Sequence, residues 1–148
     1  MPIRERLEDV AEVRQWSDVI PFHYEYTAGV AGEKFLRGLM EGKILAGYCP
    51  VCKEAFLPAR IYCVVCYGEI TKFVRVGPVG RVRALTRSGK GEGGGGAFAF
   101  VTFDGVRGGM VHRLLGRARA GSEVVARFRP AMERTGSVLD IQGFEPKR

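Results

Sequence analysis

The sequence predicts a mainly β protein with N-terminal helices, in which a small metal-binding module precedes a five-stranded barrel. Three observations predict this class. The first part of the chain has apolar residues at helical spacing, the middle holds all four cysteines, and the last part alternates apolar and polar residues between glycine turns. We therefore expect three regions, at residues 1–43, 44–76 and 77–148. At 148 residues the chain is long enough for one domain or two small ones.

Two amphipathic helices are predicted in the N-terminal region, at residues 4–19 and 31–42. Pro21 ends the first helix and Gly42 is a plausible stop for the second. The second helix carries an apolar stripe that needs a covering surface. Either the chain's own β region or a partner protein covers it, and we treat the stripe as a candidate docking surface. Its residues are Phe35, Leu36, Leu39 and Met40.

The cysteines form two Cys-x-x-Cys pairs, Cys49/Cys52 and Cys63/Cys66, separated by ten residues. Two such pairs on separate turns bring four thiolates to one point, an arrangement that suits tetrahedral Zn²⁺. With all four positions filled by thiolates, none is open to water or substrate, so we predict a structural zinc. Short hairpins around the pairs, with a strand at 44–48 and a turn back at 56–58, are typical of a zinc ribbon.

The same motif has two other implications. Cys-x-x-Cys also occurs in disulfide exchangers, but there it usually comes singly and opens a helix, so redox chemistry is the weaker alternative. Zinc knuckles often place glycine after the second cysteine, where the backbone turns left-handed. Here Lys53 follows Cys52, whereas Tyr67-Gly68 follows Cys66, so we expect the first knuckle to be strained or differently shaped.

Five short strands are predicted after the module, at 79–86, 97–103, 109–115, 122–129 and 137–143. Five strands in about seventy residues suggest a small closed barrel of the oligonucleotide/oligosaccharide-binding (OB) fold. The stretch 89–96 is nearly all glycine. It lacks the Gly-Lys-Ser/Thr ending of a phosphate-binding loop, and a flexible hairpin tip is the simpler interpretation.

The net charge is +7 and the isoelectric point is about 9.5, with arginine concentrated in the barrel. A basic domain attracts nucleic acid, phosphorylated cofactors or an acidic protein face, although charge alone does not choose among them. Phe98, Phe100 and Phe103 lie on one predicted strand, where exposed aromatics would stack on bases. Strand alternation instead predicts that most of them are core.

We expect a cytosolic protein without its own catalytic centre. The N-terminus is charged and has no apolar signal region, and no apolar run approaches a membrane span. The chain contains neither Gly-x-Ser-x-Gly nor His-Glu-x-x-His. The two histidines, His23 and His112, pair only loosely with aspartates in sequence, which chance can produce.

Residues 24–67 carry the most specific pattern of the chain: a helix, Gly42-Lys43-Ile44, the first cysteine pair, Phe56-Leu57-Pro58-Ala59-Arg60 and the second cysteine pair. This run resembles the archaeal and bacterial domain-of-unknown-function family thirty-five. The resemblance implies an N-terminal helical segment, a rubredoxin-like zinc ribbon and a C-terminal OB fold.

The resemblance also implies a function in acyl-CoA metabolism. Members pair with thiolase-like proteins, and archaeal ones look like a bridge between acetoacetyl-CoA thiolase and HMG-CoA synthase in the mevalonate route. It implies here a non-catalytic scaffold that helps to hold a CoA-linked intermediate. Arginine binds phosphates well, so Arg60, Arg81 and Arg83 are the candidates for coenzyme A or another anion.

The alternative function is binding of nucleic acid. A zinc ribbon, an OB fold and a basic isoelectric point together are the profile of translation and transcription factors. Salt-dependent binding of single strands would distinguish this class from an acyl-CoA scaffold.

Overall fold

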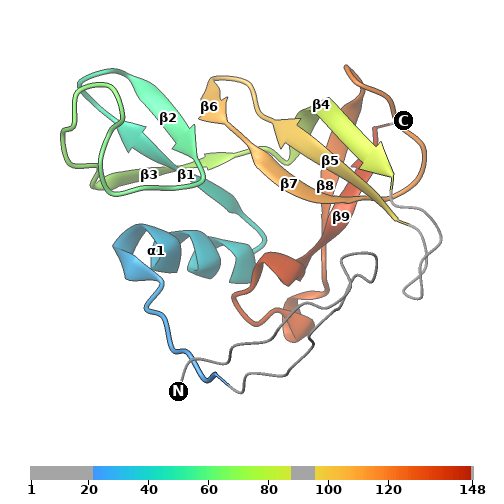
Figure 1. Ribbon diagram of the computed structural model, residues 1–148, viewed down its shortest axis with the longest axis horizontal. Helices are drawn as coiled ribbons and strands as arrows, with labels where there is room; N and C mark the ends of the chain where they lie inside the picture. The colour runs from blue at the N-terminus through green and yellow to red at the C-terminus, as the bar shows by residue number, and fades with distance from the viewer. Residues whose placement is uncertain (1–21, 88–95, 148) are drawn as a thin grey trace, which may run out of the picture.

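A computed structural model describes residues 22–87 and 96–147 (Figure 1). The helix expected at 4–19 and all but the last residue of the glycine stretch 89–96 lie outside the described residues. One α-helix, α1 (Gly29–Met40), precedes the strands. The strands are β1 (Ile44–Cys49), β2 (Glu54–Leu57), β3 (Lys72–Val76), β4 (Val79–Arg87), β5 (Ala97–Thr102), β6 (Val106–Gly108), β7 (Met110–Leu114), β8 (Glu123–Phe128) and β9 (Ile141–Pro146). Two short 3-10 helices, η1 (Ala131–Glu133) and η2 (Val138–Asp140), lie between β8 and β9.

The barrel closes in the order β4-β5-β7-β9-β8, which confirms the predicted five-stranded barrel. Its pairs are antiparallel except β7 with β9, which run parallel at Leu114 and Phe144. The strand expected at 137–143 is wrong over Val138–Asp140, which form η2. A capping box explains this difference. The Ser137 side chain accepts a backbone N–H of the turn, the Asp140 side chain accepts the backbone N–H of Ser137, and the two bonds hold the turn helical.

A second sheet, in the order β3-β1-β2-β6, joins the ribbon to the barrel half of the chain (Figure 1). The sequence prediction missed β3 and β6, and it placed Phe56 and Leu57 in a turn although both lie in β2. Strand β6 comes from the β5–β7 connection and pairs in parallel with β2. Gly108 has a φ of 92°, and a Cβ there would overlap the Leu57 carbonyl, so this close approach requires glycine.

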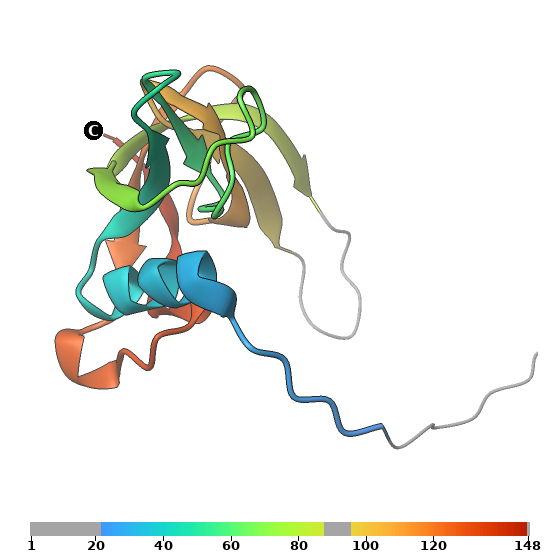
Figure 2. The same cartoon turned by 90° about the vertical axis from the view of Figure 1, so that its left-hand side faces the viewer.

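Helix α1 packs on the protein's own core. Leu39 is fully buried there, and Phe35 and Leu36 are half-buried against the same cluster. This corrects the docking prediction for Leu39, because its side chain is already covered within the chain. Met40 alone of the predicted stripe is exposed, at 48%. Figure 2 shows residues 22–28 leading away from α1 rather than back onto the barrel.

The three aromatics of this strand, most of which were predicted to be core, have different surroundings. Phe103 is buried, but Phe98 is 40% exposed and Phe100 is half-buried. Strand β5 points Ala99 and Val101 into the core. The period-2 alternation therefore holds, but the face that carries Phe98 and Phe100 is the outer one. Among the described residues, no helix is both long and apolar enough to cross a membrane.

Candidate metal centre

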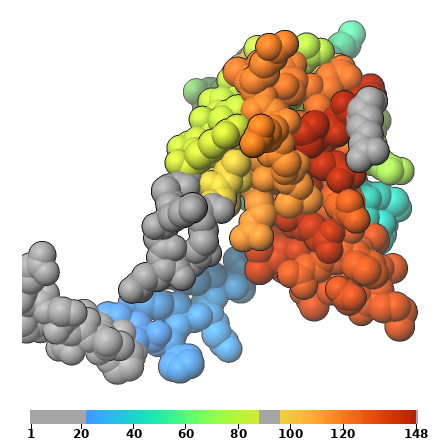
Figure 3. All heavy atoms as spheres, turned by 90° about the vertical axis from the view of Figure 1, so that its right-hand side faces the viewer, coloured from blue at the N-terminus to red at the C-terminus, as the bar shows by residue number. Residues whose placement is uncertain are grey.

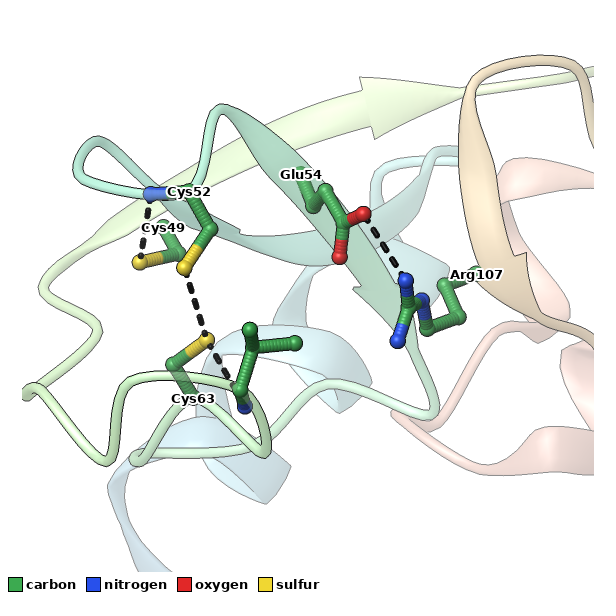
Figure 4. A network of polar contacts seen from close by, with 6 residues as sticks. Cys49, Cys52, Glu54, Cys63 and Arg107 are labelled. Atoms are coloured by element: carbon green, nitrogen blue, oxygen red, sulfur yellow. Dashed lines mark hydrogen bonds and ion pairs between the residues drawn. The ribbon is translucent and has the colours of Figure 1, made fainter.

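The two cysteine pairs converge at one end of the ribbon, where Figure 4 shows Cys49, Cys52 and Cys63 pointing toward one another. Cys49 ends β1 and Cys52 precedes β2, so the β1–β2 hairpin presents the first pair. Cys63 and Cys66 come from the loop before β3, which an isolated bridge between Tyr62 and Glu69 closes. Cys49 and Cys63 are buried and pack with Phe56 and Ile70 in a small cluster of their own.

The sulfur geometry fits a zinc ion. All four sulfur atoms lie within 4.8 Å of one another. Cys49 Sγ is 3.6 Å from Cys66 Sγ, and Cys63 Sγ is 3.8 Å from Cys52 Sγ. Tetrahedral Zn–S bonds of ~2.3 Å place sulfurs about 3.8 Å apart, so the cluster is already spaced for the metal. The four-cysteine set is therefore consistent with the structural zinc of a zinc ribbon.

The surrounding backbone favours thiolates at two positions. The N–H of Cys52 donates to Cys49 Sγ at 3.5 Å, and that of Val65 donates to Cys63 Sγ at 3.4 Å. Burial opposes ionisation of Cys63, but N–H donation from Cys66 and Val65 prevails and lowers its pKa to about 7. In contrast, hydrogen bonding with the Cys66 thiol raises the pKa of Cys52 to about 12. A bound cation reverses that order, because a coordinating thiol is deprotonated outright.

Both knuckles turn left-handed immediately after their second cysteine. Lys53 has a φ of 58° and Tyr67 a φ of 59°. From the sequence we expected strain or a different shape at the first knuckle only, but the structure shows the same left-handed backbone at both knuckles. A residue with a Cβ is strained in this region, where glycine is not. The metal-binding turns thus keep their shape without the favoured residue.

The three anion-binding candidates lie in different surroundings. Arg81 is 3.7 Å from Glu123, a carboxylate that Lys147 also contacts at 3.0 Å. Arg60 lies over the Phe56 ring at 5.8 Å, and its buried Nε has no hydrogen-bond partner among the described residues. Arg83 is exposed on β4. Arg60 belongs to the ribbon, and Arg81 and Arg83 belong to barrel strand β4.

His112 is held in a structural role. The Arg113 N–H donates to Nδ1 of His112 at 2.9 Å, so Nε2 carries the proton and donates to the Val138 carbonyl at 3.1 Å. The ring also meets Phe144 edge-on. Across residues 22–87 and 96–147, the four cysteines are the only cluster of three or more His, Cys, Asp or Glu side chains placed to share a metal.

One buried charged residue was not anticipated from the sequence. Asp140 is 1% exposed and accepts N–H bonds from Thr135, Gly136 and Ser137 at 3.0, 2.8 and 3.1 Å. Burial opposes its ionisation, but those three donors and nearby Arg129 prevail and lower its pKa. The Ser137-x-x-Asp140 spacing is the sequence signal that a capping-box search would have found.

Comparison with known proteins agrees with this geometry. Residues 37–71 match the ChsH2 rubredoxin-like zinc ribbon domain. A crystal structure of a protein with unknown function from the DUF35 family of Sulfolobus solfataricus has a TM-score of 0.65 and 23% identity, over 80% of this chain and 85% of that one.

A second structure, an Ltp2–ChsH2(DUF35) aldolase, has a TM-score of 0.58 and 18% identity, over 76% of this chain and 91% of that chain. At these identities the likeness shows the fold. No curated protein sequence matches this chain significantly.

Proposed function

With a DUF35/ChsH2-type fold, a rubredoxin-like zinc ribbon joined to an OB-like barrel, as the premise, we propose that this chain is a non-catalytic accessory subunit of an acyl-CoA enzyme complex. The partner in this proposal is a thiolase-like enzyme. One solved relative supports it, since a DUF35 chain there is part of an aldolase with Ltp2. On the resemblance of residues 24–67, the finer proposal is a bridge between a thiolase and HMG-CoA synthase.

The observation that carries the proposal is an exposed apolar surface at the ribbon tip. We call it the knuckle surface. Val51 and Tyr67 are 75% and 81% exposed, and every member lies within two residues of a cluster cysteine. Exposed apolar groups gathered in this way mark sites of protein association. The knuckle surface comprises Val51, Ile61, Tyr62, Val64, Val65 and Tyr67.

The metal explains how so small a module can present such a surface. Four thiolates around one ion hold both knuckles rigid, so few side-chain and backbone motions need to be lost on binding. The closed coordination shell also leaves no position for substrate. The ribbon is therefore suited to docking, and the partner enzyme supplies the chemistry.

A co-purification experiment tests the proposal. The tagged, zinc-loaded chain is expected to retain thiolase and synthase subunits from its native host. Val51→Asp with Tyr67→Asp should reduce retention at least tenfold, because two charges would be buried at the interface. Val111→Asp is the matched control, since Val111 is 66% exposed on the barrel.

Two results would contradict the proposal. If the knuckle variant retained the partner enzymes equally well at unchanged zinc content, the knuckle surface would not be the docking site. If the purified chain alone turned over an acyl-CoA, it would be an enzyme and the non-catalytic role would be wrong.

A second candidate function rests on one pair of neighbours on the barrel. Phe98 is 40% exposed and lies directly across from Arg113 on the adjacent strands β5 and β7. An exposed aromatic beside a cation on these strands is the arrangement by which OB folds stack and neutralise single-stranded nucleic acid. Single-strand binding that falls steeply with salt and weakens in Phe98→Ala would favour this function over the first.

A further inference from the structure

A groove crosses the barrel on the side that Figure 3 faces, over β7, β9 and β8. Strand β9 runs along its middle, because β9 lies between β7 and β8 in the barrel. Gly143 of β9 has no side chain, and a Cβ there would lie 2.7 Å from Leu115 Cγ. Leu115 therefore lies over Gly143 and forms a low floor at the centre of the groove.

One half of the groove is cationic. Arg113 of β7 and Arg129, just after β8, line it. Neither guanidinium makes a hydrogen bond or a close ion pair with another described residue, although Arg129 lies near enough to the buried Asp140 carboxylate to help lower its pKa. Gln142 adds an amide at the same end. The register between β8 and β9 shifts at Arg127/Phe128, which leaves Gln142 as the extra residue of a bulge. Bulges re-aim side chains and are common next to binding sites.

The other half carries the apolar side chains of the groove. Leu115, Val125 and Pro146 line it together with Lys147, whose ammonium group is paired with Glu123 at 3.0 Å. A flat ring can therefore lie on the three apolar side chains beside a lysine that is already paired. Arg127 and Glu145 separate the halves and pair at 3.1 Å. That pair neutralises one of the two carboxylates in the cationic half, and Glu133 is the other. Two guanidinium groups there remain available to an anion.

We propose that this groove binds a small phosphorylated nucleotide, with the phosphates at Arg113, Arg129 and Gln142 and the base on the apolar half. The ligand class follows from the two halves, because a nucleotide joins a flat, weakly polar ring to a concentrated negative charge. Guanidinium groups suit phosphate oxygens through paired hydrogen bonds. The nucleotide end of coenzyme A has this chemistry, and its identification as the ligand rests on the proposed function.

The groove differs from the sites that arginine content alone suggested. Arg81 shares Glu123 with Lys147, and Arg60 stacks on Phe56, so each of these two arginines is already engaged by a neighbouring side chain. Arg113 and Arg129 belong to one groove. The phosphate site therefore lies on the β7–β9–β8 side of the barrel, away from the ribbon cysteines.

Titration of the zinc-loaded full chain with adenosine 3′,5′-bisphosphate tests this assignment. Calorimetry should show saturable binding, and amide NMR shifts should concentrate at Arg113, Leu115, Gln142 and Arg129. Adenosine and inorganic phosphate, which each carry one half of the ligand, should bind at least tenfold more weakly. Arg113→Gln and Arg129→Gln should each weaken bisphosphate binding about tenfold, the size of one charged hydrogen bond.

Arg83→Gln is the matched control. It removes one positive charge from an exposed barrel strand, as the groove variants do, but it lies outside the groove. Equal weakening by Arg83→Gln would overturn the assignment in favour of diffuse charge attraction. Absence of saturable binding at millimolar bisphosphate would overturn it outright.

Tighter binding of a single-stranded oligonucleotide, with a salt slope for several phosphates, would also overturn it, because the groove would then serve nucleic acid. Thiolase capture is measured separately, so the two proposals fail independently. If the chain captures a thiolase but does not bind the bisphosphate, only the nucleotide-binding proposal is contradicted. If the chain binds the bisphosphate but captures no thiolase, the nucleotide-binding proposal is supported and the accessory-subunit proposal is contradicted.

Discussion

The ribbon cluster contains four buried side chains, two of them cysteines, whereas the cluster that fills the barrel contains twelve buried residues and no cysteine. Strand β1 belongs to both, since Ile44 lies in the barrel cluster and Cys49 in the ribbon cluster. Apolar burial can stabilise the barrel but is too small in the ribbon, where the metal must supply the difference. The two regions are thus joined by backbone pairing but stabilised by different chemistry.

The largest expected effect is loss of the metal. Cys63→Ser removes one of four ligands, and a structural zinc contributes on the order of 10 kcal/mol to the folding of small zinc modules. We expect zinc to fall to background, with loss of amide protection in β1, β2 and β3, while strands β4, β5 and β7 stay protected. Zinc analysis and hydrogen exchange measure this. Uniform loss of protection would show that the barrel depends on the ribbon.

The barrel side of the comparison is tested at Leu39. This side chain is fully buried in the barrel cluster, so Leu39→Ala should lower the free energy of unfolding by about 2–5 kcal/mol through lost burial and a residual cavity. Zinc content should not change, because the cysteines pack in the other cluster. Met40→Ala is the control, and its 48% exposure predicts less than about 1 kcal/mol. Equal effects in denaturant unfolding would contradict the placement of α1.

A smaller effect is expected from the buried carboxylate. Asp140→Asn replaces one acceptor oxygen with a donor facing backbone N–H groups and should destabilise by about 2 kcal/mol at pH 7. Because the pKa of Asp140 is lowered in the folded state, its contribution is present above the unfolded pKa and is lost as pH falls through the folded value. The difference between wild type and variant should therefore shrink below about pH 4.

Denaturant unfolding at pH 7 and pH 3 checks this result. Both proteins lose zinc in acid, so their difference isolates Asp140. Asp104→Asn, at an exposed turn, is the matched control and should change the stability little at either pH. A pH-independent difference would mean that Asp140 acts through packing alone.

The sequence predicted the elements whose signal is local. Cysteine spacing predicted the metal cluster, and alternation predicted the barrel strands. The missed elements depend on distant partners. Val106–Gly108 is too short to show a period and becomes a strand only because β2 lies beside it. For the same reason the sequence could not tell which face of β5 is inside, and of the three aromatics expected to be mostly core only Phe103 is fully buried.

The groove was missed for a related reason. Arg113, Arg129 and Gln142 are separated in the sequence and meet only through the order of β7, β9 and β8. Total charge predicted anion binding of some kind, but Arg81 looked as free as Arg113 until Glu123 was placed beside it. Pairing between strands, rather than composition, decides which arginines are available.

The smallest expected effect tests the ribbon turns themselves. Lys53 has a left-handed φ of 58°, so Lys53→Gly should relieve strain and stabilise the zinc-bound ribbon by about 0.5–1 kcal/mol after the entropy of glycine in the unfolded chain is subtracted. Competition with a chelator should show slower zinc loss. Lys34→Gly, on the exposed side of α1, should instead destabilise by about 1 kcal/mol, because glycine is unfavourable inside a helix. If both variants destabilise alike, the Lys53 side chain contributes more than its backbone costs, and the ribbon then depends on more than its metal.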